Sequence, residues 1–294
     1  MFNIFKQAKR SSVSDTSNKR SDQATGKTCF LSIDVEKREN QKNQPFEGVD
    51  NLDNILNVFK KHNASATLFV TGEVLEYSPD LVKKWAKDFE IGCHNYFHNQ
   101  LNKIDLIERE RQIKNFVNLH KNIFKTLPKG FRAPRNIIDN KQFPILSRYG
   151  FIYDSSVFPR YPWSFRAYSG YLGRAPIAPY FPSEKNYKKK SVGGMLLEIP
   201  ESPAPFSVPF VGTWLRKLDV KFFKSIFKLR KPNFVSLSMH SWDGTKFQGR
   251  GSKNSGKEFL KQLDEIMKFL KEIGYEFKSG EQIYEFYKNN QKSI

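Results

Sequence analysis

The chain has 294 residues and a mass of 34.3 kDa, enough for one barrel-sized domain or two smaller ones, and we expect one. Hydrophobic residues make up 38% and aromatic residues 15%, a composition that excludes a disordered protein. Lys and Arg number 49 against 30 acidic residues, and this formal charge of +19 favours a polyanionic partner: nucleic acid, an anionic membrane surface or a phosphorylated substrate.

The first segment, residues 1–26, is rich in Ser, Lys, Asp and Asn and has little periodicity. It predicts a disordered basic and polar tail in front of a single domain at 27–294. The tail lacks the run of about 7 to 15 apolar residues that a secretory signal contains, and no later stretch has about 18 in a row. We therefore expect a cytoplasmic protein without a membrane span. Its two cysteines, Cys29 and Cys93, indicate buried thiols rather than a disulfide framework.

Strand-like and helix-like segments alternate from residue 28 onward, and an irregular insert rich in Pro, Tyr and Gly interrupts them at about 159–209. Such pairs predict a parallel α/β architecture, either a barrel or an open sheet. The strand-like runs are 28–36, 66–72, 90–94, 129–134, 151–156, 232–240 and the start of 275–290. Helical spacing occurs at 51–63, 78–89, 106–124, 142–149, 258–274 and the end of 275–290.

One further helix, predicted over about 213–232, is amphipathic and strongly basic. Its predicted apolar stripe consists of Leu215, Leu218, Phe222, Ile226 and Leu229, and seven Lys and Arg residues surround it against the single acid Asp219. Two interpretations are open. The stripe could pack on the strands of a barrel while the lysines face water. Alternatively, the helix could lie in an anionic membrane interface.

Nearly every predicted strand ends in an ionisable residue. In parallel α/β folds the carboxyl ends of the strands gather the reactive groups, so these residues are candidates for a common site. In chain order they are Asp34, Glu36, His94, His98, Arg132, Asp154 and His240.

The first four of these candidates have the spacing of a metal site. Asp34 and Glu36 are two residues apart, so an extended segment points both carboxylates to one side. His94 and His98 are four apart, so a helix or a tight turn aims both imidazoles at one point. Two histidines and one carboxylate suit a divalent transition metal, and the other carboxylate would remain free as a base. Zinc is our first choice, and cobalt, nickel, manganese or iron would also fit.

Five motifs carry a resemblance to a known family. SIDVE, EIGCHNYFH, GFRAP, YDSSVFP and LSMHSW occur in the order and with roughly the separations of the polysaccharide deacetylases, the family-four carbohydrate esterases. The similarity extends from about Thr28 to Tyr287. It implies a distorted parallel (β/α) barrel of about seven strands. It also implies metal-dependent hydrolysis of an N-acyl group on a sugar.

The resemblance also assigns roles to individual residues. Asp34 matches the catalytic base of the family, and Arg132 resembles the arginine that holds this base. Asp154 resembles the acid that orients the last histidine, and His240 resembles that histidine, the general acid. His94 and His98 match the two metal-binding histidines.

The first motif departs from the family pattern. Most members have two adjacent aspartates there, the second being a metal ligand, whereas this chain has Val35, which cannot bind metal. Because part of the family reads acid, any residue, acid, we predict Glu36 as the third ligand. Arg135 stands where many members have tyrosine; it could pair with a phosphate or carboxylate on the substrate or simply be solvated.

The sequence thus predicts a hydrolase of linear amide bonds. It would remove an N-acyl group, in the first place N-acetyl, from a sugar of a surface polysaccharide or of its nucleotide-linked or polyprenyl-phosphate-linked precursor. Alternatives are a deformylase of a lipid-linked aminosugar, a metal-independent amidohydrolase and a non-catalytic glycan-binding barrel. Peripheral contact with the anionic inner face of a membrane is a further hypothesis. No nucleic-acid-binding motif is visible in the sequence, so we expect no such partner.

Overall fold

A computed structural model describes residues 26–39, 43–159, 175–191, 194, 196–201, 203–204, 208–249 and 251–291. The predicted tail lies outside these residues except for Gly26, and so do residues 160–174 of the predicted insert. The single domain predicted at 27–294 therefore stays a prediction.

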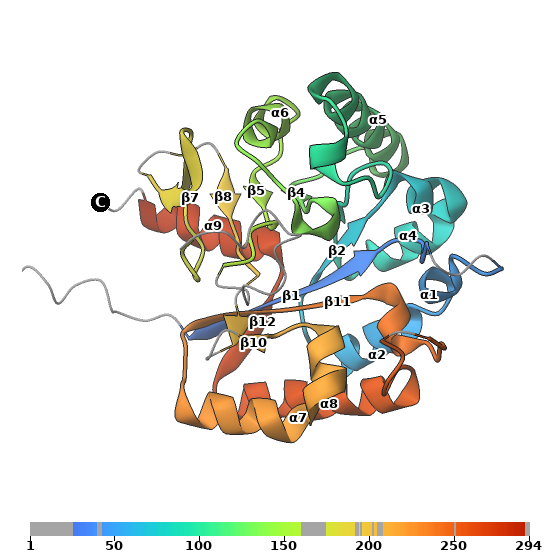
Figure 1. Cartoon of the computed structure of the whole chain (residues 1–294), viewed down its shortest axis with the longest axis vertical. Coiled ribbons are helices and arrows are strands. Elements are labelled where there is room, and N and C mark those ends of the chain that lie inside the picture. Colours follow the sequence, from blue (N-terminus) through green and yellow to red (C-terminus); the bar gives the residue numbers. More distant parts are fainter. Residues whose placement is uncertain are drawn as a thin grey trace, which may run out of the picture.

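A parallel sheet of eight strands forms the centre of the molecule and curls into a half-barrel (Figure 1). The strand order is β11-β1-β2-β3-β4-β5-β8, and β12 pairs in addition with β1. One edge of β1 is shared: its first half pairs with β12 and its second half with β2. The strands are β1 (Lys27–Val35), β2 (Thr67–Val70), β3 (Glu90–Cys93), β4 (Gly130–Phe131), β5 (Tyr153–Asp154), β8 (Leu197–Glu198), β11 (Phe234–His240) and β12 (Tyr275–Lys278).

Helices connect successive strands and cover the outside of the sheet (Figure 1). They are α1 (Glu47–Asp50), α2 (Asp53–Lys61), α3 (Gly72–Tyr77), α4 (Pro79–Trp85), α5 (Leu106–Phe124), α6 (Gln142–Arg148), α7 (Gly212–Leu229), α8 (Lys257–Glu272) and α9 (Gly280–Gln291). Within the described residues, short 3-10 helices span Leu101–Lys103, Pro134–Asn136 and Ser241–Gly244. Two small antiparallel pairs lie outside the main sheet: β6 (Pro182–Ser183) with β7 (Asn186–Lys190), and β9 (Pro203–Ala204) with β10 (Val208–Pro209).

The alternation of side chains along β1 decides which residues reach the barrel interior. Cys29, Leu31, Ile33 and Val35 belong to the large core beneath the helices. Phe30 instead joins a smaller cluster inside the barrel, with Phe69 of β2 and Tyr153 of β5 among its members. Because successive residues of a strand face opposite sides, Asp34 and Glu36 follow Phe30 on the interior face. Both carboxylates approach Nε2 of His94, Asp34 at 4.0 Å and Glu36 at 3.0 Å, so they lie on one side as expected.

The sequence located most strands of the main sheet and the longer helices, but it extended some of them too far and missed α1, α3 and β8. The predicted strands 129–134 and 151–156 shorten to two residues each, β4 and β5. The helix α3 was not predicted, and its N-cap is Thr71, whose hydroxyl accepts a hydrogen bond from the Val74 N–H at 3.4 Å. Ser78 occupies the N-cap position of α4 without a side-chain capping bond, and Pro79 stands at the start of that helix, where proline is favoured.

The apolar stripe predicted for 213–232 is only partly right. The structure interrupts α7 at Asp219, whose φ is 70° and ψ 159°, so the helical register shifts there. The residues buried against the core are Leu215, Val220, Phe223, Ile226 and Phe227, whereas Phe222 and Leu229 of the predicted stripe are exposed. Most of the apolar face thus packs as a barrel helix does. Among the described helices, none has both the length and the apolar character that a membrane span needs.

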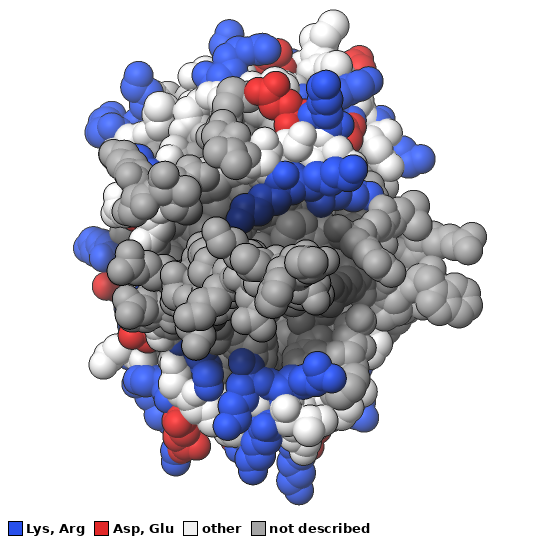
Figure 2. Space-filling model, turned by 90° about the vertical axis from the view of Figure 1, so that its left-hand side faces the viewer, with Lys and Arg blue, Asp and Glu red and all other residues white. Residues whose placement is uncertain are grey.

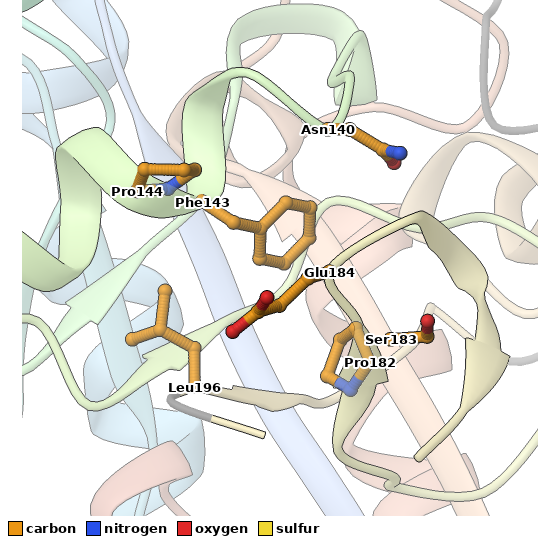
Figure 3. A pocket seen from close by; sticks show the side chains of 7 residues that line it. All are labelled: Asn140, Phe143, Pro144, Pro182, Ser183, Glu184 and Leu196. Atoms are coloured by element: carbon orange, nitrogen blue, oxygen red, sulfur yellow. The ribbon is translucent and has the colours of Figure 1, made fainter.

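The β6–β7 hairpin is fastened to the helix α6 region and encloses a small pocket of about 220 Å³ (Figure 3). Asn140 donates to the Lys185 carbonyl at 2.5 Å and accepts from the Tyr187 N–H at 2.9 Å. The ring of Phe143 stacks on that of Tyr187, with centroids 5.9 Å apart. The pocket lining shares no residue with the strand-end candidates, and we assign it a structural role.

Candidate active site

Three of the predicted residues converge at the carboxyl ends of β1 and β3. Glu36, His94 and His98 each offer one ligand atom, and these atoms lie within 4.8 Å of one another. Oε2 of Glu36 lies 3.0 Å from Nε2 of His94 and 2.6 Å from Nε2 of His98. All three side chains are at most 10% exposed. The structure therefore brings together the two histidines and the carboxylate that the sequence predicted as a metal-binding set.

The two histidines are presented by a tight turn rather than by a helix. Asn95 adopts a left-handed conformation, with φ of 64°, directly after His94. Its amide donates to Oε1 of Gln112 in α5 at 2.8 Å, and the same oxygen accepts from the Phe97 N–H at 3.3 Å. Asn tolerates this conformation better than most residues. The turn held by Gln112 places the rings of His94 and His98 with their centroids 5.3 Å apart.

A second layer of contacts orients both imidazoles. Nδ1 of His94 lies 2.8 Å from the Arg132 carbonyl oxygen, to which it donates its proton. Nδ1 of His98 lies 3.4 Å from Oε1 of Glu39. Such partners fix the tautomer that leaves Nε2 free for a ligand. The Nε2 atoms of both histidines consequently face Glu36.

The electrostatics of this set favour an ionised carboxylate. Burial alone would raise the pKa of Glu36, but His98 and His94 act against it and hold that pKa well below its usual range. For His98, burial opposes the charged form, yet Glu36 and Glu39 together raise its pKa. Each group of the Glu36 and His98 pair thus favours the charged form of the other.

The raised pKa of His98 gives a pH prediction for the metal-free protein. Because the folded pKa lies above the unfolded value of about 6.5, the stabilisation from His98 is complete below about pH 6.5 and is lost as pH rises through the folded pKa. After chelation, thermal melts should show wild type more stable than His98→Gln at pH 5.5, with the gap narrowing toward pH 9. A gap that stayed constant or widened with pH would contradict this assignment. The matched variant His62→Gln, outside the site, is the control.

Asp34 lies beside this set and is paired with arginine. Nη1 of Arg132 donates to Oδ1 of Asp34 at 2.8 Å, and Oδ2 of Asp34 lies 4.0 Å from Nε2 of His94. Burial would raise the pKa of Asp34, but Arg132, His94 and His240 outweigh it and lower that pKa. The Asp34 side chain is 13% exposed. The predicted base is therefore ionised and within reach of the predicted metal set.

Arg132 is fully buried, so its ion pairs do not lie at the surface of the protein. Its Nε and Nη2 donate to the carbonyl and the hydroxyl of Ser155, both at 2.9 Å. Nη1 also lies 3.2 Å from Oε1 of Glu201, another buried acid. The Arg132 guanidinium, at the end of β4, thus contacts the segment after β5 and the carboxylates of Asp34 and Glu201. The contact with Asp34 that was predicted for Arg132 is present.

This geometry predicts a large stability loss when Arg132 is replaced. Arg132→Met would leave the carboxylates of Asp34 and Glu201 buried without their cation, which typically costs about 3–5 kcal/mol. Urea denaturation of wild type and variant measures the difference. Arg148→Met, which removes an exposed arginine paired with Glu110, should change the midpoint little. Equal midpoints for wild type and Arg132→Met would show that the buried pairing contributes nothing.

His240 ends β11 directly beside Asp34, since these two residues are register partners in the sheet. Its ring stacks on Trp242, with centroids 4.5 Å apart and planes 12° from parallel. The following 3-10 helix fixes its backbone: the His240 N–H donates to Oδ2 of Asp243 at 3.1 Å, and the His240 side chain accepts from the Asp243 N–H. The structure thus places His240 next to the predicted base.

Asp154 has other partners than the one predicted for it. It is fully buried and accepts hydrogen bonds from the N–H and the hydroxyl of Ser156, at 3.1 Å and 2.7 Å. Its register partner is Glu198 of β8, and burial raises the pKa of both carboxyls. Within the described residues no contact joins Asp154 to His240. Its role as the acid that orients this histidine stays a prediction.

Several residues near the site were not singled out in the sequence. Glu198 lies within the run LLEI and Glu201 follows it, so the strand-end rule used for the other candidates would have found them. Asp243 is buried and pairs with the buried Arg216 of α7 at 2.9 Å, which no spacing in the sequence suggested. Glu39 also went unnoticed, and it lies between His98 and Arg135, at 3.4 Å from each.

Comparison with known proteins points to one family. Residues 22–153 match the family model described as polysaccharide deacetylase. A peptidoglycan-N-acetylglucosamine deacetylase from Bacillus cereus is 35% identical over 89 residues, which cover 30% of this chain and 32% of that protein. A peptidoglycan deacetylase from Helicobacter pylori is 26% identical over 161 residues, which cover 54% of each protein. The matched parts thus span about a third to a half of these relatives.

A solved structure shows the same fold. A putative polysaccharide deacetylase from Mycobacterium smegmatis is similar over 91% of this chain and 92% of its own, with a TM-score of 0.63 and 17% identity. The predicted distorted parallel (β/α) barrel is therefore confirmed. The family match contains Asp34, Glu36, His94, His98 and Arg132, and it ends just before Asp154.

Proposed function

We propose that the protein hydrolyses the N-acetyl group of an aminosugar with the help of one divalent metal ion, on the premise that residues 22–153 match the model of the polysaccharide deacetylase family. The convergence of Glu36, His94 and His98 beside the arginine-paired Asp34 carries the proposal. An ionised carboxylate next to a metal set is the arrangement that metal-assisted amide hydrolysis needs.

The residues present fit such an ion. The set supplies two imidazole nitrogens and one carboxylate oxygen, a donor set typical of catalytic zinc sites that keep a position open for water or substrate. Both histidines have their Nδ1 atoms engaged, so the Nε2 atoms are available as ligands. We propose zinc, with cobalt, nickel, manganese and iron as alternatives. When bound, such an ion polarises the amide carbonyl and makes water a better nucleophile near neutral pH.

The protein groups would supply the proton transfers. Asp34, ionised beside Arg132, accepts the proton of the attacking water as general base. His240, beside Asp34 at the end of β11, would act as general acid and donate a proton to the sugar nitrogen as the C–N bond breaks, which releases the amine and acetate. Trp242 restrains the His240 ring by stacking on it. Arg132 would hold Asp34 in place throughout, because its other donors are fixed on Ser155.

We propose as substrate a sugar of a surface polysaccharide or of its nucleotide-linked or polyprenyl-phosphate-linked precursor. The Helicobacter pylori relative is a peptidoglycan deacetylase, and the Bacillus cereus relative is a peptidoglycan-N-acetylglucosamine deacetylase. Arg135 supports an anionic substrate group, since its side chain is 44% exposed and near the site through Glu39. A guanidinium there suits a phosphate or a carboxylate.

Metal analysis combined with a substrate screen tests the proposal. We expect about one divalent ion per chain, acetate release from N-acetylated sugars, loss of activity with a chelator and recovery with zinc. Sugars should be offered free, nucleotide-linked and lipid-linked, in N-acetyl and N-formyl form. If the protein released formate but no acetate, it would be a deformylase and not a deacetylase. If the fully metallated protein bound glycans but hydrolysed none of them, it would be a glycan-binding barrel and not an enzyme. If it were fully active without metal, the reaction would not need the ion.

A further inference from the structure

The end of the barrel opposite the candidate site carries an apolar groove. β1 and β11 are parallel and both begin there, whereas Asp34 and His240 stand at their other ends. The groove measures about 550 Å³. Its lining is mostly apolar and includes Ile177, Pro232, Phe234, Ile283, Phe286 and Tyr287. We call it the basal groove.

Large apolar side chains protrude around the basal groove. Ile177 is 40% exposed and Phe286 38% exposed, and both line it. Leu229, the last residue of α7, is 71% exposed and precedes the lining residue Pro232 by three positions. Exposed apolar side chains that gather at one place mark an interaction surface.

Cations surround these apolar residues. Lys228, Arg230 and Lys231 flank Leu229 and are exposed, Lys278 lines the groove, and Lys288 follows the lining residue Tyr287. Two acids are near: Glu276 pairs with Lys278 at 3.1 Å, and Glu285 precedes Phe286. Figure 2 looks at the side of the molecule where β1 begins, and it shows Lys and Arg side chains gathered along two borders of this face. The surroundings of the groove are thus positively charged.

We propose that the basal groove docks on the surface of an anionic phospholipid bilayer. Leu229, Ile177 and Phe286 would enter the headgroup region, and the lysines around them would contact lipid phosphates. Nucleic acid would use the cations but leave the apolar side chains exposed to water, so lipid fits both features. The inference goes beyond the proposed hydrolysis and uses none of its residues. In this orientation the candidate site faces away from the bilayer.

The N-terminal segment of the chain is the competing occupant of the groove. Gly26 lines the groove, and residues 1–25 precede it. This segment contains five cations against two acids, so the basic surroundings would repel it. Charge complementarity therefore favours the anionic lipid.

Vesicle flotation with the full chain tests the proposal. Vesicles of phosphatidylcholine alone are compared with vesicles that contain about 30% phosphatidylglycerol, at about 50 mM and about 500 mM salt. We expect flotation with the anionic vesicles at low salt only. Lys228→Glu with Lys231→Glu, and separately Leu229→Ser with Phe286→Ser, should each lower the partition coefficient by at least about tenfold.

Matched substitutions on α5 serve as controls. Lys114→Glu with Lys121→Glu makes the same change in net charge, and Ile107→Ser removes a side chain that is 83% exposed; both should float like wild type. Failure of wild type to bind, or equal binding to both vesicle types, would overturn the proposal. The proposal would also be overturned if only the charge reversals lowered flotation, because the apolar side chains would then not enter the bilayer. A loss caused by Phe2→Ser with Phe5→Ser would overturn it as well, because the N-terminal segment would then bind the vesicles. Acetate release from a soluble sugar should be the same in every variant, which separates this test from that of the proposed hydrolysis.

Discussion

Asp34→Asn is expected to lower kcat/KM for hydrolysis of an N-acetylated sugar by about 10²- to 10⁴-fold, the usual contribution of a general base. The amide has the shape of the carboxylate and can still contact Arg132, but it cannot accept the proton of the attacking water. Because the predicted metal ligands remain in place, the metal content should be unchanged. Steady-state kinetics and metal analysis on the same preparation measure both quantities.

Asp139→Asn is the matched control for this variant. Asp139 also pairs with an arginine, Arg109, at 2.9 Å, and it lies outside the candidate site. Its replacement should leave kcat/KM within about twofold of wild type. If Asp34→Asn retained full activity at full metal content, Asp34 would not be the base. If it lost the metal as well, Asp34 would be a ligand rather than a free carboxylate.

Glu36→Ala is expected to weaken metal binding by more than about 100-fold. Replacing a residue that only orients a metal ligand already lowers metal affinity by about 10- to 100-fold, and Glu36 is predicted to be a ligand itself. The change removes the one carboxylate that faces the Nε2 atoms of His94 and His98. Activity should fall in parallel and return only at high metal concentration. Titration with a competing chelator gives the affinity, and acetate release gives the activity.

Glu39→Gln provides a graded comparison. Glu39 contacts Nδ1 of His98 at 3.4 Å and is 46% exposed, so its loss should weaken metal binding by about tenfold or less. The order wild type, Glu39→Gln, Glu36→Ala in decreasing affinity is the expected result. Full metal content and activity in Glu36→Ala would show that the third ligand lies elsewhere. Glu36 would then not take the place of the aspartate that most family members have where this chain has Val35.

The residues that converge at the site could be predicted from the sequence, because short-range geometry determines which way their side chains point. The period of two along a strand aligns Asp34 with Glu36, and the parallel order of β1, β2 and β3 brings their carboxyl ends to one edge. The spacing of His94 and His98 did not determine whether their segment is a helix or a tight turn. A helix and a tight turn satisfy the same interval, and the turn prevails because Gln112 fastens Asn95 and Phe97 from α5.

Other features depend on contacts between distant segments. The fully buried Arg132 is one example: its guanidinium reaches Asp34, Ser155 and Glu201, which lie 98, 23 and 69 residues away along the chain. The face of α7 is another, because the break at Asp219 shifts the register on which the predicted stripe rested. The sequence shows which side chains are available, but not which of them are buried together.

From the sequence by itself we predicted the parallel α/β architecture, the resemblance to the polysaccharide deacetylases and the seven candidate residues, because each follows from a local period or an ordered motif. Only the tertiary structure decided that Arg132 is shared between Asp34 and Glu201, and that Leu229 is exposed. The reason is physical: a buried charge must find its partner among whatever the packed chain brings within about 4 Å, and that set is chosen by the fold as a whole.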